Sequence, residues 1–195
     1  MKTFRHLFSW ICTAALATAA LPLLAGVPAL PDTHLKVGDA APLFAGRDQD
    51  CHKWKLAHHL GKKMVLLCFY PEDNTTGSIA EVCNLCDNMF EFKQEGVDVV
   101  GVSFDKKRTQ KEFVFKYNLD FPLLADTSGE IADAYSARMG QEKSNLVHDR
   151  KMDRRVSFLI GLDGKIIHIT DSPDPTVHMK EMAVVLAKLR ETVSR

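Results

Sequence analysis

Two cysteines three positions apart are the residues of this sequence best suited to chemistry. Cys83 and Cys86 fall in residues 79–95, where apolar side chains recur at the spacing of an amphipathic helix. Residues three apart on a helix share a face at about 5 to 6 Å, so a disulfide between these thiols needs little rearrangement. Strain inside a helix would make that disulfide easy to reduce. The spacing therefore indicates a candidate dithiol redox pair.

Two other interpretations of the cysteine pair stay open. Free cysteines are commonly buried, so Cys83 and Cys86 can be inert residues on the apolar face of the helix. A zinc site is the third interpretation, but a structural site wants four ligands and the sequence has no second close Cys/His pair. The adjacent His58 and His59 are expected in solvent. We therefore expect no bound metal and no cofactor.

Alternating strand and helix patterns must position the pair. Residues 64–70 form an unbroken apolar run, which predicts a strand buried on both faces with Cys68 in the core, while Cys51 falls in a predicted turn and is expected at the surface. The other predicted elements are a hairpin of residues 43–47 and 54–57, a helix over 79–95 with Ser78 at or near its N-cap, a strand over 97–103, a helix over 109–117, a strand over 121–124, a helix over 130–137, a hairpin of residues 155–160 and 165–170, and a last helix over about 175–193. This order predicts an α/β fold with a mixed sheet, helices on both faces and an N-terminal β-hairpin.

The composition fits one globular domain. The 195 residues are 46% hydrophobic and 26% charged, and 25 basic side chains balance 25 acidic ones, so the formal net charge is zero. Nucleic-acid binding is normally carried by a strongly basic face. We therefore expect no nucleic-acid partner.

Residues 1–29 have the three regions of an export signal. A basic start is followed by an apolar stretch over about residues 7–25 and by small residues that predict cleavage after Ala29. An uncleaved membrane anchor is the alternative, because the apolar run approaches the ~20 residues that a span needs. Removing the two basic residues of the signal leaves 23 basic and 25 acidic side chains in a single domain of residues 30–195. We expect this domain to be exported, to a bacterial periplasm or the medium, with no membrane contact beyond the signal.

Five segments carry a resemblance to a known family. They are FYPEDNTTGS at residues 69–78, AEVCNLCDNM at 80–89, GVDVVGVS at 96–103, PLLAD at 122–126 and RVSFLI at 155–160. In this order they resemble the peroxiredoxins, and within them the bacterioferritin comigratory protein or peroxiredoxin Q branch, over about residues 35–192. The resemblance implies a thioredoxin-like fold, a hydroperoxide substrate, electrons from thioredoxin-like proteins, and a monomer or weak dimer.

The family's active-site pattern can be carried onto five positions of this sequence. Pro71 and Thr75 match the loop before the catalytic helix, and Arg155 matches the arginine that lies beside the reacting sulfur and polarises the peroxide. Cys83 matches the resolving cysteine. Ser78 stands where the family carries its peroxidatic cysteine. The resemblance therefore implies an active site that has lost its nucleophile.

Ser78 limits the chemistry that the resemblance implies. Peroxide reduction begins with a thiolate that becomes a sulfenic acid, and a serine hydroxyl neither ionises near neutral pH nor has such a state. Serine is instead a favoured helix N-cap. On a regular helix, positions 78 and 83 lie about 8 Å apart, beyond the roughly 7 Å limit for a disulfide, so family members must unwind this helix to form their bridge. Cys86 is a second departure, since the branch often carries arginine there.

Three functions are compatible with these residues. The first is an exported thiol-dependent peroxidase in which Cys83 has taken over as nucleophile. The second is a redox-degenerate thioredoxin-fold protein that binds a ligand or partner through the pocket of Thr75 and Arg155. The third is a dithiol–disulfide oxidoreductase that uses Cys83 and Cys86 on other proteins.

Overall fold

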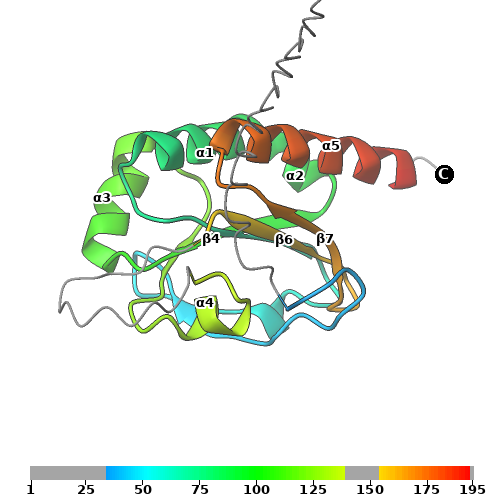
Figure 1. The fold of residues 1–195 in the computed structure, drawn as a ribbon, viewed down its shortest axis with the longest axis horizontal. Helices are drawn as coiled ribbons and strands as arrows, with labels where there is room; N and C mark the ends of the chain where they lie inside the picture. The colour runs from blue at the N-terminus through cyan, green and yellow to red at the C-terminus, as the bar shows by residue number, and fades with distance from the viewer. Residues whose placement is uncertain (1–33, 139–153, 194–195) are drawn as a thin grey trace, which may run out of the picture. The chain divides into compact units, whose positions relative to one another are not determined.

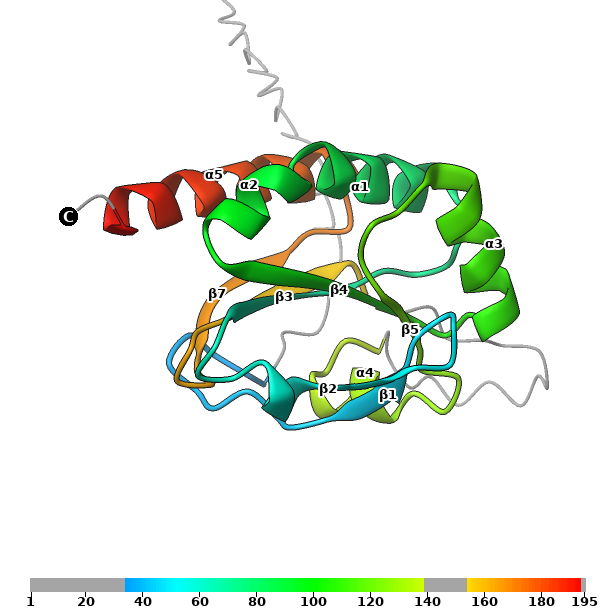
Figure 2. The same ribbon diagram turned by 180° about the vertical axis from the view of Figure 1, so that it is seen from behind.

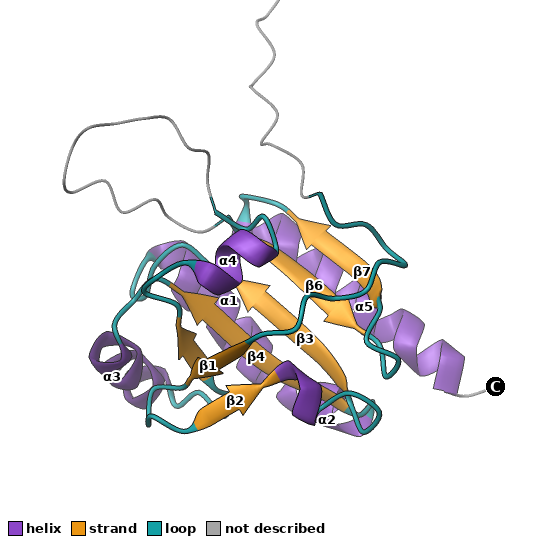
Figure 3. Cartoon of the chain, turned by 90° about the horizontal axis from the view of Figure 1, so that it is seen from below, coloured by secondary structure: helices purple, strands orange, loops and turns teal. Residues whose placement is uncertain are grey.

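The core of the protein is a five-stranded mixed sheet. The computed structural model describes residues 34–138 and 154–193, so the predicted export signal lies outside the described residues. The strands are β3 (Met64–Phe69), β4 (Val97–Ser103), β5 (Leu123–Ala125), β6 (Val156–Ile160) and β7 (Ile166–Asp171), in the spatial order β5-β4-β3-β6-β7. Figure 3 shows β4, β3, β6 and β7 side by side. Strands β3, β4 and β5 run parallel, while β6 is antiparallel to β3 and β7 is antiparallel to β6. The predicted mixed sheet is confirmed.

Two layers cover the sheet. Four helices lie on one face: α1 (Thr76–Asp87), α2 (Met89–Gln94), α3 (Lys107–Tyr117) and α5 (Pro175–Val193) (Figures 1 and 2). The other face carries the hairpin of β1 (Ala45–Arg47) and β2 (Lys53–Lys55), the short 3-10 helix η1 (Leu56–His58) and α4 (Glu130–Ala134). No helix among the described residues is long and apolar enough to cross a membrane.

Strand β3 lies between β4 and β6 and divides the core. Its side chains alternate, so Leu66 and Cys68 enter the cluster beneath α1, α2 and α3, whereas Val65, Leu67 and Phe69 enter the cluster on the hairpin side. Both clusters are buried, which explains why the strand reads as a continuous apolar run. The expectation that Cys68 lies in the core is confirmed.

The helix predicted over residues 79–95 is broken in two. Asn88 leaves the helical conformation (φ −101°, ψ 7°), and its side-chain amide donates to the carbonyl oxygen of Asn84 at 2.8 Å. An asparagine side chain that takes a helical carbonyl competes with the backbone and favours a helix end. After the break Phe92 faces the core, but Phe90, which the pattern placed on the apolar face, is 71% exposed. The prediction of one continuous helix was wrong.

The two adjacent histidines have different surroundings. His58 is exposed, as is Cys51, and both agree with the sequence prediction. His59 is only half exposed, because its ring stacks on Trp54 with centroids 4.5 Å apart and its Nδ1 lies 2.8 Å from Asp98 Oδ2. The expectation that His59 lies in solvent was wrong, and its contacts join η1 to β2 and β4.

Candidate active site

A tight loop after β3 delivers the chain to the start of α1. Pro71 is half-buried, and Asn74 adopts the left-handed conformation with φ +61°, which asparagine tolerates better than most residues. Thr75 then returns to extended backbone, and its Oγ1 accepts a hydrogen bond from the Ser78 N–H at 3.2 Å. This is an N-cap contact, so α1 begins at Thr76.

Ser78 is therefore the third residue of α1 and not its N-cap, as the sequence pattern had suggested. The helix starts earlier because Thr75 supplies the capping oxygen. Ser78 is fully buried, and its Oγ is hydrogen-bonded to the Thr75 hydroxyl at 2.8 Å. The Thr75 hydroxyl also lies 3.3 Å from the Glu72 carbonyl oxygen, and a hydroxyl carries only one hydrogen, so either hydroxyl of the Thr75–Ser78 pair can be the donor. The first turn of α1 thus presents hydroxyls and backbone N–H groups where the positive end of the helix dipole lies.

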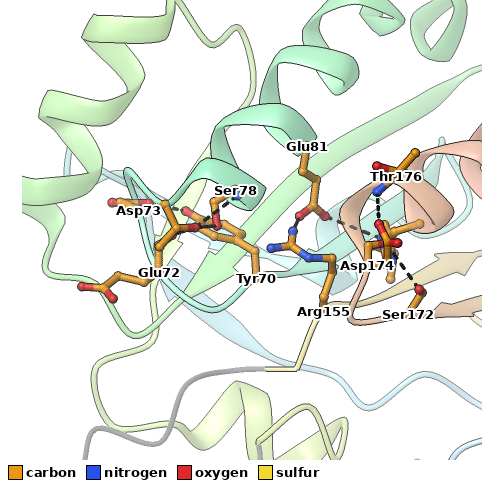
Figure 4. A network of polar contacts seen from close by, with 12 residues as sticks. Tyr70, Glu72, Asp73, Ser78, Glu81, Arg155, Ser172, Asp174 and Thr176 are labelled. Atoms are coloured by element: carbon orange, nitrogen blue, oxygen red, sulfur yellow. Dashed lines mark hydrogen bonds and ion pairs between the residues drawn. The ribbon is translucent and has the colours of Figure 1, made fainter.

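A buried ion pair joins this helix to the sheet. Arg155, directly before β6, and Glu81, one turn after Ser78, are 7% and 2% exposed, and the Arg155 Nη1 donates to Glu81 Oε2 (Figure 4). Burial lowers the pKa of Arg155, but a guanidinium stays charged in proteins. Because neither charge could be buried alone without a large desolvation penalty, the pair fixes α1 against the start of β6.

His178, in the first turn of α5, completes the buried cluster. Its Nε2 lies 2.9 Å from Ser157 Oγ on β6 and 3.6 Å from Glu81 Oε1. Burial, and then the positive charge of Arg155, lower the pKa of His178 to about 4. The imidazole is therefore neutral near pH 7, and it leaves the Glu81 carboxylate to Arg155 as its charged partner.

Gly77 allows the guanidinium to approach α1. A Cβ atom at this position would lie 2.9 Å from Arg155 Nη2 and 3.4 Å from Pro175 Cγ at the start of α5. The first of these distances is too short for real carbon atoms, so any side chain here would displace the arginine. Because Gly77 has no side chain, the Arg155 guanidinium can lie against the helix backbone directly before Ser78.

A second polar network lies behind the loop. The Tyr70 hydroxyl donates to Asp73 Oδ1 at 2.8 Å, the Asp73 N–H donates to Asp105 Oδ2 at 2.8 Å, and the Ser103 hydroxyl donates to the same Asp105 oxygen at 3.0 Å. Burial, followed by the negative charge of Asp105, raises the pKa of Asp73 to about 7. These contacts tie the loop between Pro71 and Thr75 to the end of β4.

The two cysteines of α1 lie further along the helix than these polar groups. Cys83 and Cys86 are both half-buried, and all four cysteines of the described residues, including Cys51 and Cys68, are free thiols. Burial raises the pKa of Cys68 to about 12. Burial also raises the pKa of Cys86, with smaller contributions from the charges of Asp120 and Cys83, while a backbone hydrogen bond from Asp120 lowers it.

Within the described ranges, no group of three or more His, Cys, Asp or Glu side chains could hold a metal ion. The predicted site residues instead form two separate groups. Thr75 and Ser78 meet at the start of α1, where Gly77 brings Arg155 alongside, and Pro71 lies in the same loop. The cysteine pair lies further along the helix.

Sequence reasoning missed three buried participants. Glu81, His178 and Asp73 were not among the candidates, although each is at most 5% exposed and bonded to the site or its loop. A usable signal existed for Glu81, because it is a charged residue on the inward face of an otherwise apolar helix. His178 lies in α5, seven residues before the buried Val185, so helical periodicity was a signal for it too. Asp73 lies in a polar loop, where no periodic pattern distinguishes a buried side chain.

Comparisons with known proteins agree with this architecture. A family model described as the AhpC/TSA family matches residues 37–169. The peroxiredoxin Bcp of Escherichia coli is 39% identical over 157 residues, which are 80% of this chain and 97% of that protein. The residues that the family model matches include the loop, α1 and Arg155.

Solved structures of similar fold include two from the same group of proteins. The peroxidoxin BcpB of Mycobacterium tuberculosis has a TM-score of 0.71 and 30% identity, covering 81% of this chain and 98% of its own. The bacterioferritin comigratory protein of Xanthomonas campestris, solved to study its alkyl peroxide reduction activity, has a TM-score of 0.67 and 23% identity, covering 83% and 99%. The second likeness supports the fold alone. The thioredoxin-like fold expected from the resemblance is confirmed.

The close approach at Gly77 predicts that Gly77→Ala destabilises the protein. Alanine is ordinarily better than glycine inside a helix by about 1 kcal/mol, but forcing a methyl group into a packed site costs about 1–3 kcal/mol. Because Arg155 is held by its ion pair with Glu81 and cannot easily move aside, we expect the cost to exceed the gain, with a net loss of up to about 2 kcal/mol in the free energy of unfolding, measured with denaturant. Thr76→Ala, at the exposed neighbouring position, serves as the control and should change little. A Gly77→Ala protein as stable as the parent would contradict the geometry.

The raised pKa of Asp73 predicts a pH-dependent stability. In the unfolded chain Asp73 ionises near 3.8, whereas in the folded protein it ionises near 7, so the folded state binds the proton more tightly. Its contribution is therefore fully present below about pH 4 and lost as the pH rises towards 7. Asp73→Asn should remove this part of the pH dependence of the unfolding free energy, whereas Glu130→Gln, at an exposed position outside this network, should leave it unchanged. Equal pH profiles for the parent and Asp73→Asn would refute the shift.

Proposed function

The chain belongs to the AhpC/TSA family, and from that membership we propose that it is a peroxiredoxin-type enzyme that reduces hydroperoxides with electrons from a thioredoxin-type dithiol protein. The observation that carries the proposal is the cluster of polar groups at the start of α1. Thr75 and Ser78 hydroxyls, the N-terminal end of the helix and the buried Arg155 guanidinium converge there. Such a site favours an oxygen that gains negative charge.

The polar groups at the start of α1 can stabilise the negative charge on the leaving oxygen of a hydroperoxide. When the O–O bond breaks, one oxygen departs as an alkoxide or hydroxide, and donors fixed in a buried site stabilise that charge better than water does. Arg155 stays in place because its other side is paired with Glu81. Ser78 can donate a hydrogen bond but supplies no electrons, so the attacking sulfur must come from elsewhere.

We assign the attacking sulfur to Cys83. The thiol of Cys68 is buried with a pKa of about 12, the pKa of Cys86 is raised, and Cys51 lies in the hairpin turn on the opposite face of the sheet. A thiolate is the reactive form of cysteine, so burial disfavours attack by Cys68 and Cys86. Cys83 is half-buried on α1 itself and five residues beyond Ser78.

The proposed reaction has two steps, the oxidation of Cys83 by the hydroperoxide and its reduction by the dithiol donor. The Cys83 thiolate attacks one peroxide oxygen, the O–O bond breaks, and the other oxygen leaves with a proton as an alcohol or water. Cys83 becomes a sulfenic acid. A dithiol donor then returns two electrons, which restores the thiol and releases water. Because Cys83 lies about 8 Å along the helix from position 78, a peroxide held beside Arg155 meets this sulfur only when the first turn of α1 opens.

The position of Ser78 favours a second candidate function. The hydroxyls of Thr75 and Ser78 and the Arg155 guanidinium can bind a small ligand through its oxygen atoms. Because no sulfur lies among these groups, the ligand would remain unchanged. In that case the protein is a binding member of its family. The two functions differ in one readout, which is the consumption of hydroperoxide in the presence of a dithiol donor.

Peroxide turnover with a thioredoxin-type donor tests the proposed enzyme. We expect the parent to consume hydroperoxide slowly, and Cys83→Ser to lower the rate to that of the donor alone. Ser78→Cys should raise it by about tenfold or more, each factor of ten being ~1.4 kcal/mol of barrier, since the sulfur then lies among the polar groups at the start of α1. Cys51→Ser is the control and should turn over as the parent does. Equal rates for the parent and Cys83→Ser would sink the assignment of Cys83 and favour the binding function.

Residues 1–29 are part of the proposal, with cleavage after Ala29 and export of the domain of residues 30–195 as a monomer or weak dimer. The basic start, apolar stretch and small residues of this segment support it. N-terminal sequencing of the protein from the bacterial periplasm or the medium should begin at Leu30. A chain that begins at Met1 and stays in the cytosol would count against export.

A further inference from the structure

The last turn of α1 holds two thiols side by side. Cys83 and Cys86 are three residues apart, both are half-buried, and α1 ends at Asp87. Residues with this spacing share a helix face with Cβ atoms about 5–6 Å apart. The two thiols also interact electrostatically, because a negative charge on Cys83 raises the pKa of Cys86. The two sulfurs are therefore close enough to react with each other after a small movement.

The backbone next to Cys86 can provide that movement. A disulfide brings Cβ atoms to about 3.5–4.5 Å, which means a shift of roughly 1–2 Å from helical spacing. Asn88 already departs from the helix, and its backbone N–H points to the carbonyl oxygens of both Asn84 and Cys86. Regular helix continues for only one residue beyond Cys86, to Asp87, before the break at Asn88, and α2 begins anew at Met89.

The surroundings of the two thiols favour Cys83 as the first nucleophile and Cys86 as the second. Burial raises the pKa of Cys86, so this thiol is the poorer first nucleophile. Once Cys83 is a sulfenic acid, Cys86 needs only to attack a neighbouring sulfur that is already electrophilic. Ser78 and the first turn of α1, with the Thr75 cap, lie outside this step.

We propose that Cys83 and Cys86 form a reversible disulfide within the last turn of α1, with Cys86 as the resolving thiol. The inference extends the proposed function, because Cys86 supplies the second sulfur of the same reaction. The Cys86 sulfur attacks the Cys83 sulfenic acid, the S–S bond forms, and the S–O bond breaks as hydroxide leaves with the Cys86 proton as water. Overall, a hydroperoxide and two thiols give an alcohol, water and a disulfide, and an external dithiol returns the two electrons.

The helical location predicts how this disulfide behaves. Its formation pulls the two residues out of helical spacing, and a strained disulfide is more readily reduced than a relaxed one. Formation of the disulfide leaves the start of α1 in place, because Ser78 and its hydrogen bonds with Thr75 are not disturbed. Only the attack on the peroxide needs the first turn to open, and the disulfide step avoids the unwinding that a bridge between positions 78 and 83 would need.

The experiment treats the full chain, in a Cys51→Ser background, with tert-butyl hydroperoxide or with diamide, which oxidises neighbouring thiols without peroxide. After remaining thiols are blocked, peptide mass spectrometry should find the peptide with Cys83 and Cys86 lighter by two hydrogens and unblocked, and dithiothreitol should reverse this. The Cys83→Ser and Cys86→Ser variants should each lack the bridge, with circular dichroism to establish that both fold.

The two oxidants separate this inference from the proposed function. A bridge with both oxidants supports both. A bridge with diamide alone supports the dithiol pair and contradicts peroxide reduction by Cys83. No bridge with either oxidant overturns the pair, and if peroxide consumption then still depends on Cys83, the proposed function stands with an external thiol as its resolving partner.

Discussion

The buried ion pair between Arg155 and Glu81 is the interaction on which the arrangement of the site depends. It joins the start of β6 to the second turn of α1, and both side chains are almost entirely removed from water. Removing one partner from such a pair typically costs about 3–5 kcal/mol, because the other charge is left buried and alone. The lack of a side chain at Gly77 and the neutral state of His178 both follow from the space and charge around this pair. The pair therefore positions α1 as well as the arginine.

This constraint explains how the polar groups at the start of α1 keep their arrangement with a serine at position 78. The positions of Arg155, Thr75 and Ser78 are set by helix capping and by the buried charge pair, and neither of these needs a sulfur at position 78. In the proposed function, Ser78 supplies no electrons at the point where the peroxide would be held. In the account proposed here, binding and redox chemistry are separated along one helix, with the oxygen-binding groups at its start and the two thiols in its last turn.

Periodicity and turn residues were enough to predict the sheet, the hairpin and the layers, because the buried strands are continuous apolar runs and their connections are short. They located α5, but they did not locate the boundaries of α1 and α2. The break at Asn88 depends on one side-chain hydrogen bond, and the start of α1 depends on whether Thr75 or Ser78 supplies the capping oxygen. Glu81 and Asp73 were missed for a related reason: their roles come from partners 74 and 32 positions away in the chain, which local patterns do not reveal.

The most direct test of the account identifies the sulfur that peroxide oxidises first. The full chain with Cys86→Ser would be mixed with one equivalent of hydroperoxide in the presence of dimedone, which traps sulfenic acids, and the labelled residue would be located by peptide mass spectrometry. The account predicts that the label is on Cys83, and that it is absent when Cys83→Ser is added. Labelling of Cys51 or Cys68 instead, or no labelling while peroxide is consumed, would contradict it.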